Sequence, residues 1–94
     1  MAVMMIMEWP GVTLEGYEKV RQITNFEVDQ PVGGMFHVVA LDGDILRVVD
    51  VWESAEQFQA FVEARLMPAT QQAGITAAPE VKILPAYNVF FPGK

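Results

Sequence analysis

The stretch that predicts the fold is GMFHVVALDGDILRVVDVW, residues 34–52. Two apolar runs, 34–41 and 44–52, flank the dipeptide Asp42-Gly43. Gly tolerates the positive φ that a two-residue hairpin turn requires, and the flanking runs are rich in residues that favour strands. We therefore predict a β-hairpin with Asp42 and Gly43 as its turn.

The register expected from this turn gathers polar residues on one face of the hairpin. In this register His37 lies opposite Val48. Met35 lies opposite Asp50, which makes Asp50 a diagonal neighbour of the imidazole. Because side chains alternate along a strand, one face carries Met35, His37, Val39, Leu46, Val48, Asp50 and Trp52. A His beside a carboxylate is an arrangement that orients an imidazole and moves a proton.

Length and composition bound the class of protein. The chain has 94 residues, and we expect one domain that spans residues 1–94. Its hydrophobic content of 52% is high for a soluble domain, which favours surface that a partner covers. The sequence contains no Cys, which excludes disulfides and thiolate metal sites and is typical of the cytoplasm, where we expect the protein.

The charge pattern bears on the kinds of partner. The formal net charge is −6, and the Lys and Arg residues are scattered rather than clustered. Phosphate binding needs clustered positive charge, so nucleic acid and anionic membrane surfaces are not expected as partners. The apolar run 1–7 is too short to span a membrane and lacks the basic start of a signal peptide. We interpret this run as a buried strand.

Capping and strand-breaking residues predict the order of the elements. Residues 2–8 form a first strand, and Thr13 caps a helix that ends near residue 23. Ser54 begins a second helix, which Pro68 either kinks or restarts. The last strand is predicted over residues 80–91.

The order β-α-β-β-α-β is that of the ferredoxin-like α+β fold, a four-stranded antiparallel sheet with both helices on one face. Two helices cover only one face, yet the other face of the hairpin is also apolar. That face carries Phe36, Val38, Ala40, Ile45, Val49 and Val51. Packing of this sheet against a second copy would bury them, so we predict a homodimer closed by the helix-free faces.

A motif at the end of the hairpin resembles a known group of proteins. The motif is VWESAEQF, residues 51–58, in which a strand ends in Trp-Glu-Ser and a helix carries a Phe four residues after the Ser. It is similar to the dimeric α/β-barrel superfamily, which includes the antibiotic-biosynthesis-monooxygenase-like proteins. The order of elements extends this resemblance over the whole chain. The segments 35–38, 48–52 and 66–69 are similar to small bacterial members to which we attach no reaction.

The resemblance implies a dimeric α/β barrel with a ligand pocket between the helices and the sheet of each subunit. Members include cofactor-free oxygenases of aromatic polyketides, polyketide cyclases, haem-degrading enzymes, isomerases and proteins without known activity. Trp52 lies where the oxygenases and the haem-degrading members often place a pocket Trp. The resemblance therefore assigns the face of His37 and Asp50 to the pocket.

The sequence also departs from these relatives. Haem-degrading members ligate iron through a His on the helix after the Trp, and the corresponding segment here, EARLMP at 63–68, has none, so haem is not expected. The oxygenases surround their Trp with an Asn and a Tyr, where this chain has Val48 and Phe58. We expect no cofactor, and a chain with one His and no Cys is not expected to hold a metal ion.

The candidate catalytic residues are His37, as a proton shuttle, and Asp50, as the group that orients its imidazole. Each also has a structural interpretation. His37 is then a residue at a strand end that is either partly exposed to water or bonded to a backbone carbonyl. Asp50 is then a carboxylate satisfied by backbone, by Arg47 or by a dimer mate. The candidate ligand-binding residues are Trp52, Met35, Phe61, Tyr17 and Tyr87. Ordinary core packing is the alternative role of the aromatic residues.

Two functions fit these residues. In the first, the protein is a cofactor-free enzyme that acts on a small apolar, aromatic or polyketide-like ligand. Proton transfer in the pocket would lead to cyclisation, isomerisation or oxygenation of that ligand. In the second, the protein is a non-catalytic module that binds a hydrophobic ligand or serves only as a structural dimer.

Overall fold

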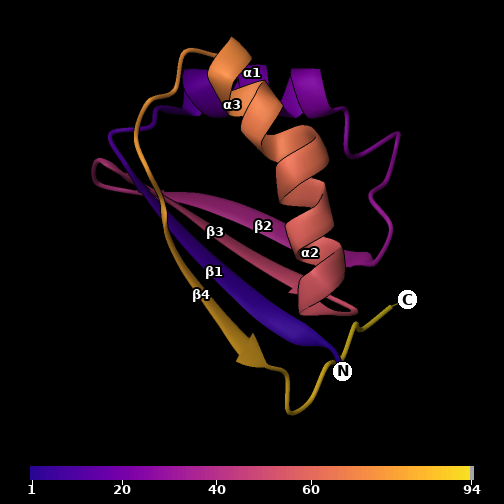
Figure 1. The fold of residues 1–94 in the computed structure, drawn as a ribbon. Helices are drawn as coiled ribbons and strands as arrows, with labels where there is room; N and C mark the ends of the chain where they lie inside the picture. Colours follow the sequence, from indigo (N-terminus) through magenta and orange to yellow (C-terminus); the bar gives the residue numbers. More distant parts are fainter. Residues whose placement is uncertain (94) are drawn as a thin grey trace.

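The computed structural model describes residues 1–93 and contains the strands and helices that the sequence predicts (Figure 1). In chain order the elements are β1 (Val3–Pro10), α1 (Leu14–Thr24), β2 (Gly34–Asp42), β3 (Ile45–Trp52), α2 (Ala55–Phe61), a π-helical turn η1 (Val62–Leu66), α3 (Met67–Gln72) and β4 (Glu80–Pro85). The strands form one antiparallel sheet in the order β2-β3-β1-β4. Figure 1 shows the helices on one face of this sheet, so the predicted ferredoxin-like α+β fold is confirmed.

The hydrophobic core follows from the alternation of side chains along β1 and β3. Burial alternates residue by residue along both strands, because one face lies under the helices. The buried set on the sheet consists of Val3, Met5, Met7 and Trp9 of β1 and Leu46, Val48 and Trp52 of β3. Phe58 of α2 packs against this set from above. Each such side chain contributes about 1.5–3 kcal/mol through the hydrophobic effect.

The hairpin turn lies one residue further along the chain than the sequence predicts. Asp42 pairs with Ile45, which leaves Gly43 and Asp44 as the turn residues. Gly43 has a φ of 61°, and Asp44 keeps the usual negative φ. A turn of this kind needs a positive φ only at its first position, which Gly occupies without a steric penalty. The predicted turn would have placed Asp42 at that position.

The shifted turn changes the register of β2 against β3. His37 lies opposite Asp50, and not opposite Val48 as predicted. The register also shifts at a bulge near the start of β2, where Met35 is the extra residue and does not pair with Asp50. Because the slip between the predicted and observed pairing is two residues, every side chain stays on its predicted face.

The helices begin at the predicted caps. Thr13 Oγ1 accepts a hydrogen bond from Gly16 N at 3.0 Å, and Ser54 Oγ accepts one from Gln57 N at 3.2 Å. The second helical region widens into η1 and resumes as α3, with Pro68 in the first turn. The backbone stays helical through residues 55–72, so the helix does not restart at Pro68; instead the wider turn η1 directly precedes this residue, whose ring would clash with the carbonyl of the preceding turn in a regular α-helix.

The last strand is shorter than the sequence predicts. β4 ends at Pro85, whose partner on β1 is Val3, whereas the prediction extended to residue 91. Since β1 itself begins at Val3, the later residues have no neighbouring strand with which to continue the ladder.

The helix-free face carries apolar side chains that a single chain leaves partly exposed. Phe36 and Val38 of β2 are 44% and 45% exposed, and Leu84 of β4 is 41% exposed. The ring of Phe36 also contacts the ring of Phe91, with their centroids 5.8 Å apart. These residues belong to the surface for which the sequence predicts a partner.

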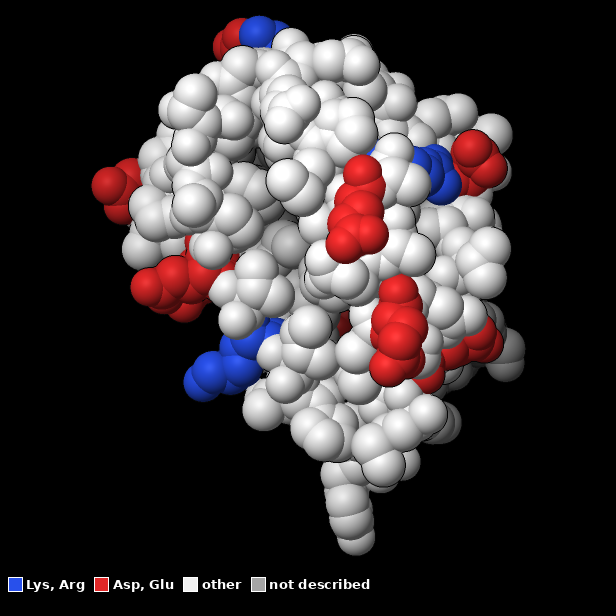
Figure 2. Space-filling model, viewed as in Figure 1, with Lys and Arg blue, Asp and Glu red and all other residues white. Residues whose placement is uncertain are grey.

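Charged side chains are spread over the surface. Figure 2 shows acidic side chains distributed over the side that carries the helices, where the Lys and Arg side chains in view stand apart from one another. Within residues 1–93 no helix is both long enough and apolar enough to cross a membrane.

Candidate functional site

A cavity of about 470 Å³ lies between the helices and the sheet. Most of its wall is apolar and consists of Met5, Met7 and Trp9 from β1, Leu46, Val48 and Trp52 from β3, and Phe58, Phe61 and Leu66 from the helical region. A volume of this size is within the range of small-molecule sites, which combine an apolar lining with a few polar groups. Here the polar groups include His37, Asp50 and Tyr17.

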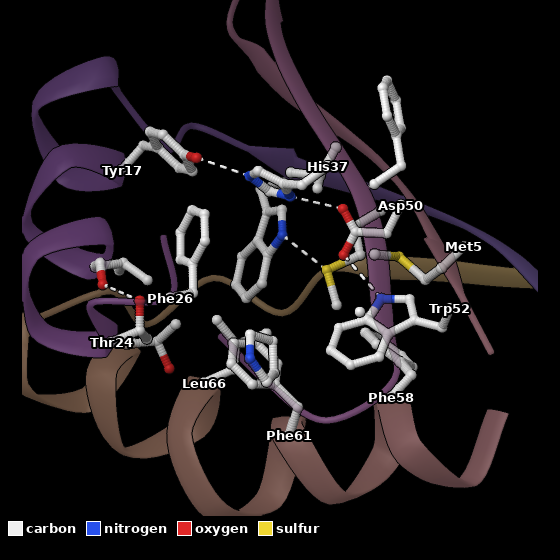
Figure 3. Close-up of a pocket in the computed structure, with 18 of the residues that line it drawn as sticks. Met5, Tyr17, Thr24, Phe26, His37, Asp50, Trp52, Phe58, Phe61 and Leu66 are labelled. Atoms are coloured by element: carbon white, nitrogen blue, oxygen red, sulfur yellow. Dashed lines mark hydrogen bonds and ion pairs between the residues drawn. The ribbon is translucent and has the colours of Figure 1, made fainter. Parts of the chain in front are cut away.

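These polar groups form a continuous chain of hydrogen bonds along one wall (Figure 3). His37 Nδ1 lies 2.6 Å from Asp50 Oδ1, and His37 Nε2 lies 2.7 Å from the hydroxyl of Tyr17. Trp52 Nε1 donates to the second carboxylate oxygen, Asp50 Oδ2, at 3.0 Å. This series of hydrogen bonds begins at the buried residues Trp52 and Asp50, which are 3% and 7% exposed, and ends at the more exposed Tyr17.

The fold brings these residues together from three elements. His37 and Asp50 are cross-strand partners on β2 and β3, so the hairpin register sets their contact. Trp52 follows Asp50 by two residues and therefore shares its face. Tyr17 comes from α1, and its ring meets the edge of the imidazole through the hydroxyl, with the two ring planes 16° apart and their centroids separated by 6.1 Å.

The hydrogen bonds define which atoms carry protons. A carboxylate only accepts, so Asp50 accepts one hydrogen bond from the N–H at His37 Nδ1 and another from the indole N–H of Trp52. With Nδ1 protonated in the neutral imidazole, Nε2 keeps its lone pair and accepts from the hydroxyl of Tyr17. We assign this tautomer because it satisfies every bond in the chain.

The environment of Tyr17 keeps its hydroxyl protonated. Burial is the largest effect and raises the pKa of Tyr17 to about 12, although the nearby guanidinium of Arg21 opposes the shift. Desolvation acts in this direction because it disfavours the anionic form of a phenol. Tyr17 is therefore a proton donor at neutral pH.

The structure brings together nearly all of the site residues predicted from the sequence. Those that line the cavity are His37, Asp50, Trp52, Met35, Phe61 and Tyr17. The side chain of His37 is partly exposed, as one structural interpretation expected, but two of the partners expected in the structural interpretations are not observed. Arg47 pairs with Glu8 and Asp42 and not with Asp50, and the His37 ring bonds side chains rather than a backbone carbonyl.

Tyr87, the remaining candidate ligand-binding residue, does not line the cavity. Its side chain is fully exposed, and it follows the end of β4, the edge strand furthest from β2. The expectation that Tyr87 faces the cavity relied on a longer last strand, and the strand ends at Pro85 because β1 offers no further partner.

The loop between α1 and β2 contributes residues that sequence reasoning missed. Phe26 lines the cavity and places the edge of its ring against the imidazole of His37, with centroids 4.9 Å apart. Arg65 of η1 links this loop to the helical region. Its guanidinium donates to the backbone carbonyl of Asp29 at 2.8 Å and lies 5.3 Å from the ring centre of Phe61 in α2. The one signal for Phe26 was an aromatic residue in an otherwise polar loop.

The arrangement is suited to moving a proton in an apolar space. Among the described residues, no group of three or more His, Asp or Glu side chains is placed to hold a metal ion. A neutral His oriented by a carboxylate acts as a general base, and the imidazolium that forms is stabilised by that carboxylate. Burial of Asp50 strengthens this electrostatic interaction, because the carboxylate is little screened by solvent.

Comparison with known proteins adds information about the fold. No protein-family model and no curated protein matches the sequence. A variant of SnoaB, a cofactor-independent oxygenase from Streptomyces nogalater, has a TM-score of 0.70 at 12% identity, over 94% of this chain and 95% of that chain. A protein of unknown function from Nitrosomonas europaea gives a TM-score of 0.74 at 12% identity, over 99% and 96% of the two chains.

A third structure is that of a candidate antibiotic biosynthesis monooxygenase from Chloroflexus aurantiacus J-10-fl. It has a TM-score of 0.65 at 18% identity and covers 96% of this chain and 98% of that chain. Identities this low bear on the fold alone. The chain has the ferredoxin-like fold of the antibiotic-biosynthesis-monooxygenase-like proteins, as its VWESAEQF motif predicts.

Proposed function

We propose that this protein binds a small apolar ligand in the cavity and acts on it as a cofactor-free enzyme. The observation that carries the proposal is the contact of 2.6 Å between His37 Nδ1 and Asp50 Oδ1 at the wall of an apolar cavity. Burying the Asp50 carboxylate is costly, and a carboxylate held against an imidazole is common where a proton is transferred.

The lining of the cavity favours an aromatic or polyketide-like ligand. Trp52, Phe58 and Phe61 offer ring faces and edges, and the thioethers of Met5 and Met7 adapt to an irregular outline. The likeness to SnoaB, a cofactor-independent oxygenase, supports chemistry without a cofactor by analogy of fold.

The proposed reaction begins with proton abstraction from a carbon next to a carbonyl. The His37–Asp50 pair receives the proton, and the ligand becomes an enolate. Cyclisation, isomerisation or oxygenation are the possible fates of such an anion. General base catalysis of this kind contributes about 10²–10⁴-fold to a rate.

We further propose that residues 1–94 act as one domain that forms a homodimer in the cytoplasm. Phe36, Val38 and Leu84 of the helix-free face are 44%, 45% and 41% exposed, and contact with a second copy would bury them. Two sheets packed face to face in this way would close an α/β barrel.

A substrate panel of aromatic ketones tests the enzyme, with His37→Ala as the decisive variant. We expect wild-type turnover and a loss of about 10²–10⁴-fold in His37→Ala. Leu41→Ala is the matched control, because Leu41 is on the same strand but does not line the cavity. Equal turnover in wild type and His37→Ala, with both folded by circular dichroism, would reject the mechanism.

One observation favours the non-catalytic alternative. Within the described residues, every buried side-chain nitrogen and oxygen atom has a hydrogen-bond partner without any ligand. A structural network would have this property. In that case Asp50→Ala destabilises the protein and no member of the substrate panel turns over.

A further inference from the structure

We propose that Tyr17, rather than His37 itself, is the residue that exchanges a proton with the bound ligand. This inference rests on the proposed function and assigns the order of groups within the site. Tyr17 would be the catalytic residue in contact with the ligand, His37 the proton store behind it, and Asp50 the counterion of that store.

Both nitrogens of His37 are occupied by other side chains of the protein. Asp50 Oδ1 lies 2.6 Å from Nδ1, and the hydroxyl of Tyr17 lies 2.7 Å from Nε2. An imidazole accepts a proton only at a nitrogen with a free lone pair. A ligand therefore reaches the His37 base either by displacing Tyr17 or by passing its proton through Tyr17.

The hydroxyl oxygen of Tyr17 can still accept hydrogen bonds. A hydroxyl donates one hydrogen bond and accepts up to two. Among residues 1–93, the partner of this hydroxyl is His37 Nε2, to which it donates. Its lone pairs are thus available to an acidic hydrogen of a ligand, and Tyr17 lines the cavity.

The transfer of a proton to the Tyr17 oxygen and the transfer of the original hydroxyl proton to His37 favour each other. A pKa of about 12 makes a free Tyr17 phenolate unfavourable at neutral pH, so the hydroxyl gives up its proton only as it receives another. The Tyr17 and His37 rings are nearly parallel, and Phe26 packs against the imidazole edge, which holds the donor and the acceptor in place.

The step balances within the site. The C–H bond of the ligand breaks, its proton bonds to the Tyr17 oxygen, and its electron pair remains on the ligand as an enolate. At the same time the original O–H bond of Tyr17 breaks and that proton bonds to His37 Nε2. The products are an enolate and an imidazolium that is paired with the Asp50 carboxylate, with no oxidant consumed. Reversal in D₂O returns deuterium to the carbon.

The test is hydrogen–deuterium exchange at the α carbon of 2-tetralone in D₂O, followed by proton NMR. We expect wild type to accelerate exchange, and Tyr17→Phe to lower the enzymatic rate about 100-fold or more. His37→Gln should lower it as well. Thr76→Val is the control, because it also removes a hydroxyl, at an exposed position outside the cavity lining.

The outcomes separate this inference from the proposed function. Wild-type exchange in Tyr17→Phe with loss in His37→Gln would mean that His37 takes the proton directly, which overturns the role of Tyr17 and keeps the enzyme. No acceleration by wild type, or equal rates in wild type and His37→Gln, would overturn both.

A second measurement does not depend on removing the hydroxyl. The chain has two tyrosines, so 3-fluorotyrosine incorporated in a Tyr87→Phe background labels Tyr17 alone. Fluorine lowers the pKa of the phenol. We therefore expect the alkaline limb of the pH profile of the exchange rate to move to lower pH. An unmoved limb would overturn the relay, since a purely structural Tyr17 has no reason to affect that profile.

Discussion

The two faces of the β2–β3 hairpin differ in where they place polar and apolar groups. On the helix side Asp50 is 7% exposed and both of its oxygens accept hydrogen bonds. On the helix-free side Phe36 and Val38 are 44% and 45% exposed. A buried carboxylate and exposed apolar side chains are the reverse of the usual distribution. One hairpin thus carries a feature typical of reaction sites on one face and a feature typical of association on the other.

The largest expected effect is on the helix-free face. In a twofold dimer, Val38→Lys would bury two unpaired positive charges, and we expect a loss of about 5 kcal/mol in association free energy. Sedimentation velocity over a concentration series should show a dimer for wild type and a monomer for Val38→Lys.

The control for this prediction is Val28→Lys. Val28 is 80% exposed in the loop between α1 and β2, so its replacement should leave the dimer unchanged. If the wild type is a monomer, or if the dimer persists in Val38→Lys, the helix-free face is not a dimer interface.

The next effect is on the stability of the helix side. Asp50→Ala leaves the N–H groups of His37 and Trp52 without their acceptor, and we expect a loss of about 3 kcal/mol in the free energy of unfolding. Urea titration measures this loss. Asp44→Ala, which removes an exposed carboxylate from the turn, should change stability little. If the two variants unfold at the same urea concentration, the hydrogen bonds of Asp50 do not contribute to the stability of the fold.

A smaller effect isolates the bond between the indole and the carboxylate. Trp52→Phe removes the donor to Asp50 Oδ2, whereas Trp9→Phe removes a donor whose acceptor is only the thioether of Met7, at 3.3 Å. Both residues are buried, so the loss of ring volume is similar. We expect Trp52→Phe to cost about 1 kcal/mol more in thermal or urea unfolding. The reverse order would contradict the assigned bond.

The smallest effect is a dependence of stability on alkaline pH. The pKa of Tyr17 is raised from 10.0 to about 12 in the folded protein, chiefly by burial. The folded state therefore holds this proton more tightly, and the free energy of unfolding falls as the pH rises from the unfolded value toward the folded one. We expect the loss to be at most about 1 kcal/mol, because solvent screens a half-buried group. Tyr17→Phe should have a shallower decline in urea unfolding over the same pH range, and identical declines would contradict the assignment.

The sequence predicted the faces of the hairpin better than its pairing. Gly43 fits either position of a two-residue turn, so the sequence alone did not distinguish the two registers. The error was two residues, and side chains repeat with that period, which kept His37 and Asp50 on one face. The predicted register made Asp50 a diagonal neighbour of His37. A contact between the two side chains was therefore compatible with the prediction, although the predicted cross-strand partner of His37 was Val48.

The contacts of Tyr17 and Tyr87 lay beyond sequence reasoning for different reasons. The bond from Tyr17 to His37 joins α1 to β2, and it depends on how the helix packs over the sheet, which residue spacing does not encode. The exposure of Tyr87 depends on where β1 begins, because that strand limits the length of β4. Local patterns predict elements and caps, whereas packing between elements decides which side chains meet.

The wall of the cavity also has an optical consequence. The chain contains two tryptophans, Trp9 and Trp52, and both line the cavity. All of the indole fluorescence of the protein therefore originates at the candidate site. A ligand that enters, or a change in charge at Asp50, should alter the emission of the unlabelled protein. Occupancy of the cavity can therefore be followed by intrinsic tryptophan fluorescence.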